Sequence, residues 1–264
     1  MFLGIKCDND DAFRRTILAV GDSFTFGDQV SNDETWPSCL QQKTGRGVAN
    51  AGVSGYGPAQ ALRRAQLELK KNKYSELILS VLVTDEEFDR DRLQYKSGFA
   101  KPALIKNESN ISWSDIPDMN RLGTIYNPSQ PNKSLIFFYE RSLIFAVFFD
   151  RFVPRYNFSG NQLTIVHPNA PDLDDAIHWT LSEFASIEGP RKILMLQYSE
   201  NMSNEAILEL RNKLLKISEK LLLKVVDTYD HLKVGEAKKI WFSHHTPLGN
   251  RMVCEYLYEK VFAE

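Results

Sequence analysis

The sequence predicts an α/β protein, a three-layer α/β/α sandwich whose middle layer is a parallel sheet of about five strands. Short apolar runs alternate with segments of helical periodicity, which is the pattern of a parallel sheet covered by helices on both faces. The chain has 264 residues, 43% of them hydrophobic, which is enough for one domain with a large core. We therefore expect a single domain over residues 1–264 with a large insertion at about 86–190.

Five apolar runs are the predicted strands. Each is short and contains apolar residues, most often Ile, Leu and Val, as buried strands do. In chain order the runs lie at Thr16–Val20, Gly47–Ala51, Glu76–Val83, Lys192–Gln197 and Lys224–Asp227.

The segments between the strands predict crossover helices. "GPAQALRRAQLELKK" begins at Gly57 and places Pro58 in the first turn, where proline is favoured. In "SNEAILELRNKLLKISEKLLL", Ser203 is the expected N-cap. The expected buried positions of the two helices recur at helical spacing: Leu62, Ala65 and Leu69 in the first, and Ile207, Leu210, Leu214, Ile217 and Leu221 in the second.

The expected insertion interrupts this alternation. It contains "NPSQPNK" and "NAPDLDD", which are rich in turn-forming residues. The aromatic segment Ser134–Arg155 lies between them, and it is interrupted by Glu140, Arg141, Asp150 and Arg151, charges that would be costly in lipid. We expect this segment to be a helix that packs in the core or covers a cleft, and we expect no integral membrane segment.

Charge and cysteine content exclude several classes of protein. The formal net charge is -2 and the pI is about 6.2, so nucleic acid is not an expected partner. Cys7, Cys39 and Cys254 are an odd number without metal-ligand spacing, so we expect buried free thiols. No apolar stretch follows positive charge at the N-terminus, which predicts a cytoplasmic protein; a longer chain with a leader would be extracytoplasmic.

Polar residues gather where the predicted strands end, which is where parallel sheets bind their ligands. The first strand is followed by "GDSFTFG", with Ser23 in the turn, the second by "NAGVSGYG" and the third by "LVTDEEFDR". "SHHTPLGN" near the C-terminus holds two of the five histidines. A serine hydroxyl needs a base within hydrogen-bond reach to attack a carbonyl, and histidine suits that role near neutral pH. There are two alternatives: Ser23 caps the following helix, or the helix N-terminus binds an anion.

These residues resemble the motifs of the SGNH or GDSL esterases and acyltransferases. The resemblance implies the flavodoxin-like sheet of that fold and places Ser23 as the nucleophile, His244 as the base and Gly55 as a backbone donor to the oxyanion. Thr84 stands where the family usually has an asparagine donor. The resemblance spans roughly residues 17–101 and 241–259.

One residue of the family pattern is missing. The acid that normally orients the histidine is replaced, since Trp241 lies three residues and Phe242 two residues before His244. Either Asp227 or Asp230 reaches His244 from the last strand, or a backbone carbonyl or Ser243 orients it. We expect the second arrangement and a slow enzyme.

The function expected from these residues is hydrolysis of an acetyl or short acyl ester on a small molecule or carbohydrate, with no cofactor and no metal. The alternatives are an O-acyltransferase that acts on a carbohydrate hydroxyl, and a degenerate module that binds a glycan or ester. "NAGVSGYGPAQAL" and the stretch after Ser23 also resemble SGNH-like domains of polysaccharide O-acetylation proteins. A phosphate or nucleotide binder is the least supported alternative, because no phosphate-binding motif is present.

Overall fold

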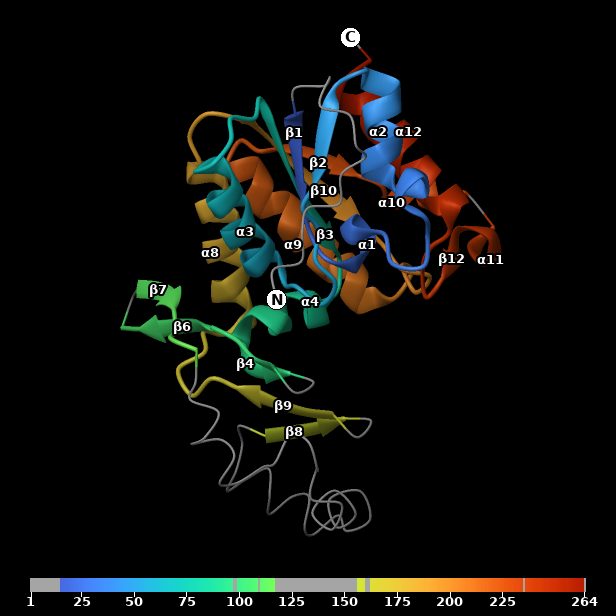
Figure 1. The fold of residues 1–264 in the computed structure, drawn as a ribbon. Coiled ribbons are helices and arrows are strands. Elements are labelled where there is room, and N and C mark those ends of the chain that lie inside the picture. The colour runs from blue at the N-terminus through green and yellow to red at the C-terminus, as the bar shows by residue number, and fades with distance from the viewer. Residues whose placement is uncertain are drawn as a thin grey trace. The chain divides into compact units, whose positions relative to one another are not determined.

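The computed structural model describes residues 15–96, 99–108, 110–116, 156–159, 162–234 and 236–263 (Figure 1). The chain forms two compact units, one made of Met1–Arg90 with Ile177–Glu264 and the other of Asp91–Ala176. The aromatic segment Ser134–Arg155, predicted as a helix, lies outside the described residues. None of the helices in the described ranges combines the length and the apolar character needed to cross a bilayer.

A five-stranded parallel sheet is the centre of the first unit and confirms the predicted fold class. Neighbouring strands follow the order β11-β10-β3-β1-β2, so β1 lies between β2 and β3. β3 is buried along its whole length, as expected of a strand covered on both faces. The strands are β1 (Arg15–Val20), β2 (Gly47–Asn50), β3 (Glu76–Leu82), β10 (Arg191–Gln197) and β11 (Lys224–Asp227), each close to its predicted bounds.

Helices cover both faces of this sheet. α2 and α12 lie together on one face, and α3 and α9 lie on the other (Figure 1). The helices of the described chain are α1 (Ser23–Phe26), α2 (Trp36–Thr44), α3 (Pro58–Leu69), α4 (Asp85–Asp89), α8 (Leu173–Ser186), α9 (Glu205–Lys220), α10 (Tyr229–Lys233), α11 (Ala237–Ile240) and α12 (Pro247–Val261), with 3-10 turns at Asn32–Glu34 and Arg90–Arg92.

The helix starts follow from local chemistry. α3 begins with Pro58, and the side chain of Gln60 accepts a hydrogen bond from the backbone N–H of Gly57 at 3.1 Å. The predicted cap of α9 is wrong by one residue: Asn204, not Ser203, accepts from Ala206 N at 2.9 Å. Both residue types cap helices well, so the sequence could not distinguish the two positions.

The second unit is built from antiparallel strands. One sheet has the order β5-β4-β9-β8, and a separate hairpin pairs β6 with β7. The strands are β4 (Leu93–Lys96), β5 (Phe99–Ala100), β6 (Leu104–Asn107), β7 (Asn110–Trp113), β8 (Tyr156–Ser159) and β9 (Gln162–Val166). The sequence pattern predicted none of these strands, because they are two to five residues long and carry little periodic signal.

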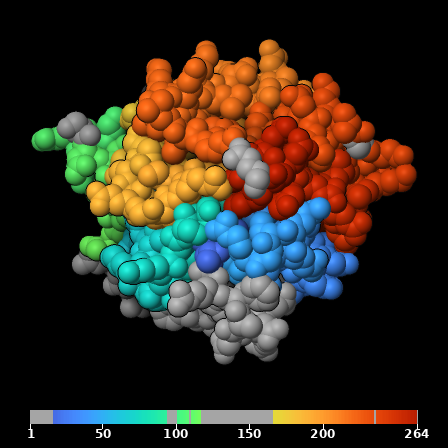
Figure 2. Space-filling view, turned by 90° about the horizontal axis from the view of Figure 1, so that it is seen from above, coloured from blue at the N-terminus to red at the C-terminus, as the bar shows by residue number. Residues whose placement is uncertain are grey.

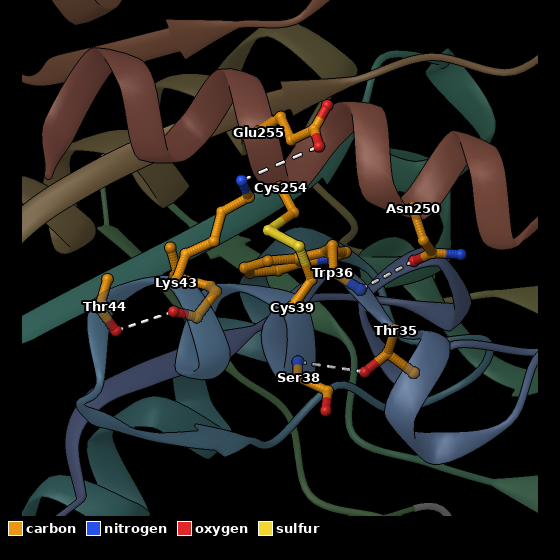
Figure 3. Close-up of a disulfide and its surroundings, with 10 residues drawn as sticks. Thr35, Trp36, Ser38, Cys39, Lys43, Thr44, Asn250, Cys254 and Glu255 are labelled. Carbon is orange, nitrogen blue, oxygen red and sulfur yellow. Dashed lines mark hydrogen bonds and ion pairs between the residues drawn. A yellow bond between two sulfur atoms is a disulfide. The ribbon is translucent and has the colours of Figure 1, made fainter. Parts of the chain in front are cut away.

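A disulfide corrects the expectation of free thiols. Cys39 of α2 and Cys254 of α12 are bonded, with their Cα atoms 6.1 Å apart (Figure 3). The two cysteines are 215 residues apart in the sequence, so only the packing of α2 against α12 reveals the pair. In Figure 2 the blue surface of the α2 segment borders the red surface of α12, which is the packing that the disulfide fixes.

Loss of this disulfide is expected to destabilise the protein. A native cross-link restricts the unfolded chain and typically contributes about 2–4 kcal/mol. The variant Cys254→Ser should therefore lower the melting temperature by about 10 °C, as measured by calorimetry. Cys7→Ser is the matched control, since it removes a thiol that is not in this pair. Equal melting temperatures for wild type and Cys254→Ser would contradict the expectation.

Candidate active site

The turn between β1 and α1 presents Ser23 at the carboxyl end of a central strand. Gly21 permits this turn, because a Cβ there would lie 2.3 Å from Thr25 Oγ1 and 2.8 Å from Ser80 O. Asp22 is the N-cap of α1 and accepts a hydrogen bond from Phe24 N at 3.0 Å. The N-cap of this helix is therefore Asp22, so the hydroxyl of Ser23 is not used for capping.

The carboxyl group of Asp22 is buried beneath the turn. Burial raises its pKa to about 6, although the Arg90 charge and the backbone N–H groups of the turn lower the pKa. Near pH 6 this carboxyl group, which belongs to the residue before Ser23, therefore changes charge.

Ser23 and His244 are brought together from the two ends of the chain. His244 Nε2 lies 2.9 Å from Ser23 Oγ, which is hydrogen-bond distance. Ser23 is 7% exposed and His244 is half-buried, so the pair is shielded on one side and open on the other. The neighbouring histidine, His245, does not face Ser23 and instead contacts the carbonyl oxygen of Tyr198.

A short hairpin positions His244. β12 (Trp241–Phe242) pairs with β13 (His244–His245), and Ser243 makes the turn with φ +66°. Trp241 Nε1 and His245 Nε2 both donate to the carbonyl oxygen of Tyr198, at 2.9 and 3.1 Å. Burial lowers the pKa of His245 to about 4, so it stays neutral and serves as an anchor of the hairpin.

The start of α12 holds the hairpin from the other side. Asn250 donates to the carbonyl oxygens of His245 and Thr246 at 3.1 and 3.2 Å, and accepts from Trp36 N at 3.0 Å (Figure 3). At Gly249 a Cβ would lie 2.5 Å from Ile240 O, so only glycine allows this close approach. The histidine hairpin is thus bonded to α12, and the same Asn250 side chain links α12 to the start of α2.

Among the described residues, no acid orients the imidazole of His244. Its buried Nδ1 atom has no hydrogen-bond partner in that part of the chain. The expectation of a backbone carbonyl or Ser243 as its partner is therefore wrong. The ring instead packs on Phe24, with ring centroids 5.0 Å apart, and Phe24 also contacts His245 edge to face. Van der Waals contact and the Ser23 bond hold the ring in place.

The two carboxylates considered from the last strand are engaged elsewhere. Asp227 accepts from Tyr198 Oη at 2.8 Å, from Arg211 Nε at 2.7 Å and from Tyr229 N at 3.1 Å. The side chain of Asp230 is 83% exposed and pairs with Arg211 at 3.8 Å. Burial and the Asp227 carboxylate raise the pKa of Tyr198 far above its usual range. This network supports the carbonyl on which the hairpin is anchored.

Charges around His244 act on it in opposite directions. Burial lowers the pKa of His244, Asp28 opposes this, and Arg90 lowers the pKa further. Asp28 is fixed beside Ser23, since its N–H donates to Ser23 O at 3.1 Å and its carboxylate accepts from Ser54 Oγ at 2.7 Å. In the described part of the chain, Asp28 is the carboxylate whose charge raises the pKa of this histidine.

Gly55 and Thr84 follow the two strands that flank β1. Gly55 has φ +79° and a Cβ there would meet nothing within 4 Å, so its backbone borders open space. Thr84 is half-buried at the start of α4, and its side chain makes no capping hydrogen bond. Ser23 N donates no hydrogen bond in the part of the chain that the structure describes. Strand order places these three groups around one strand end.

Sequence reasoning missed three residues that build the site. Asn50, at the end of β2, donates to Thr25 O at 2.9 Å and accepts from Gly52 N at 3.1 Å, so it joins α1 to the Gly55 loop. Phe24 and Asp28 are the others. A polar residue that ends a buried strand was the available signal for Asn50; nothing in the sequence distinguished Phe24 or Asp28.

The fold is that of the G-D-S-L, or SGNH, lipolytic proteins. A structure assigned to the lipolytic G-D-S-L family, from Desulfitobacterium hafniense DCB-2, is similar with a TM-score of 0.51 and 14% identity, over 93% of this chain and 99% of that one. The structure of TesA is similar with a TM-score of 0.50 and 13% identity, over 94% and 98% of the two chains. No protein-family model and no curated protein matches the sequence.

Proposed function

We propose that the protein is a serine esterase that hydrolyses an acetyl or short acyl ester through Ser23 and His244. The observation that carries the proposal is the 2.9 Å contact between Ser23 Oγ and His244 Nε2 at the carboxyl end of β1. The resemblance of both sequence motifs to SGNH enzymes, and a fold shared with G-D-S-L lipolytic proteins, support it.

The reaction follows from the roles that these groups can take. Ser23 Oγ forms a bond to the ester carbonyl carbon while His244 Nε2 accepts the hydroxyl proton. The N–H groups of Ser23 and Gly55, with the hydroxyl of Thr84, would donate to the oxyanion. The carbon–oxygen bond of the ester breaks, and His244 returns the proton to the leaving alcohol. Water then attacks the acyl-enzyme by the same steps, which releases the acid and free Ser23.

Turnover by this pair is expected to be slow. Because Nδ1 has no bonded partner in the described chain, the tautomer of His244 is unfixed and no hydrogen bond there stabilises its protonated form. In serine hydrolases with a full triad, disabling the acid costs about 10,000-fold in turnover. The contact with Phe24 orients the imidazole ring, but it does not supply the negative charge that a triad acid would place beside the protonated histidine.

Labelling with a fluorophosphonate tests the covalent step. Intact protein is incubated with the probe and with p-nitrophenyl acetate, and the modified peptide is identified by mass spectrometry. Modification confined to Ser23, together with ester turnover, is expected. Hydrolysis without modification of Ser23 would contradict the proposal, and neither modification nor turnover would favour the binding module. Adding a sugar acceptor to the assay distinguishes transfer from hydrolysis by its O-acylated product.

The pH dependence of catalysis should reflect the surroundings of His244. A base must be neutral to accept a proton, and burial lowers the pKa of this histidine. The acid limb of the kcat/KM profile should therefore lie below about pH 6.5, the ordinary value for histidine. In Asp28→Asn the opposing carboxylate is lost, the pKa of His244 falls further, and the acid limb should move to lower pH. A limb that moves to higher pH would contradict this assignment.

We propose in addition that the protein works in an oxidising compartment. Disulfides persist in such compartments and are rare in the reducing cytosol. Cys39 and Cys254, which form the disulfide in the structure, are the support for this proposal. Alkylation of protein taken directly from its native source, before any reductant is added, should leave these two cysteines unmodified.

A further inference from the structure

The hairpin that carries His244 has two different faces. Its two strands pair in antiparallel register, with Trp241 opposite His245 and Phe242 opposite His244. Directly opposed residues of an antiparallel pair project from the same face. The face with Trp241 and His245 is buried and bonded to Tyr198 O. The other face therefore carries Phe242 beside the imidazole of His244.

The side chain of Phe242 is largely exposed to solvent, which is unusual for a phenylalanine with a structural role. Its side chain is 77% exposed, whereas its neighbour Trp241 is 5% exposed. An aromatic ring in water contributes nothing to the core, and its burial by a ligand is favourable. The hairpin is already held by its other face, by Asn250 and by the Ser23 contact. A ring beside the reacting atoms is thus free to contact substrate.

The chemistry of His244 decides which part of the substrate Phe242 meets. His244 Nε2 passes its proton to the oxygen of the leaving alcohol, so the alcohol lies on the histidine side of Ser23. The acyl group's carbonyl oxygen points instead toward the donors at Ser23 N and Gly55. Since Phe242 stands on the histidine side, its neighbour is the alcohol.

We propose that Phe242 determines specificity for the alcohol part of the ester, and that the preferred alcohol presents a flat apolar ring face. This inference rests on the proposed esterase function. An aryl group and the C–H face of a sugar ring share this chemistry, and both pack against an aromatic side chain. A small aliphatic alcohol would leave the Phe242 ring exposed, so contact with this ring would not strengthen its binding.

Comparison of esters with one acyl group tests the proposal. Wild type and Phe242→Ala are assayed on ethyl acetate, 2-naphthyl acetate and an O-acetylated methyl xyloside. The variant should lose about tenfold more kcat/KM on a ring alcohol than on ethyl acetate, mainly through KM. Phe242→Trp, which keeps an aromatic face, should restore the preference. The naphthyl and xyloside arms show which ring the site prefers, and loss on either supports the proposal.

Three results would overturn it. An equal loss on all three acetates would mean that Phe242 acts only through His244. A loss that follows acyl length, in ethyl acetate against ethyl hexanoate, would place Phe242 on the acyl side. The same pattern in Leu222→Ala, whose side chain is 92% exposed, would show an unspecific effect. Fluorophosphonate labelling of Ser23 in Phe242→Ala separates these failures from failure of the esterase function, in which neither protein would be labelled.

Discussion

Ser23→Ala is expected to reduce ester hydrolysis to the background rate, the largest effect of any substitution considered. The substitution removes the atom that forms the acyl-enzyme, and in serine hydrolases such a loss costs up to about a million-fold in turnover. Because His244 has no bonded acid among the described residues, the starting rate is lower, and a loss of about 1000-fold or more would already reach background. Steady-state kinetics with p-nitrophenyl acetate measures the effect.

The fold should survive Ser23→Ala. The hydroxyl's described partner is His244 Nε2, and Asp22 caps the helix in its place. Calorimetry should give a melting temperature close to that of wild type. Ser203→Ala, which changes an exposed serine elsewhere, is the matched control. Turnover above about a tenth of the wild-type rate in Ser23→Ala would be incompatible with a covalent mechanism.

His244→Gln should produce the second largest loss, about 100-fold in kcat. Glutamine fills similar space but cannot take the proton of Ser23. The loss is expected to be smaller than for Ser23→Ala, because a solvent hydroxide can still deprotonate the serine slowly. If hydroxide replaces the histidine as the base, the residual rate should rise with pH, and steady-state assays across the pH range measure this rise.

A double variant tests whether the two residues act as a unit. In the Ser23→Ala background, His244→Gln should cost nothing further, since the base has no nucleophile to serve. His178→Gln, on the exposed side of α8, is the control for a histidine outside the site. Independent, multiplying losses from Ser23→Ala and His244→Gln would argue that the 2.9 Å contact is structural only.

The sheet was predictable because its strands are continuous apolar runs. Each predicted strand lies within about a residue of the observed one, and in β1, β3 and β10 burial on both faces leaves few polar residues to blur the pattern. The antiparallel strands from β4 to β9 were not predicted. They are short, and their side chains do not repeat with a period that a single sequence can show.

The proximity of Ser23 and His244 was predictable, because each lies in a short motif next to a strand end. Ser23 belongs to "GDSFTFG" and His244 to "HHTPLGN", and the structure brings these two side chains together. The residues that contact the His244 ring or shift its pKa were not predictable. Phe24 acts by ring contact from another element, and Asp28 acts by charge through space, so neither leaves a motif. The disulfide was missed for the same reason, since its partners meet only after folding.

The Cys39–Cys254 bond makes the stretch between those residues a covalent ring. Ser23 lies on the tail before the ring, and His244 lies within it, 221 residues from Ser23 along the chain. One broken peptide bond anywhere in the ring, including all of Asp91–Ala176, leaves every part of the chain still attached to every other. Ser23 and His244 are therefore also linked by a short covalent path that runs through α2, the disulfide and α12 and does not depend on the long polypeptide between them.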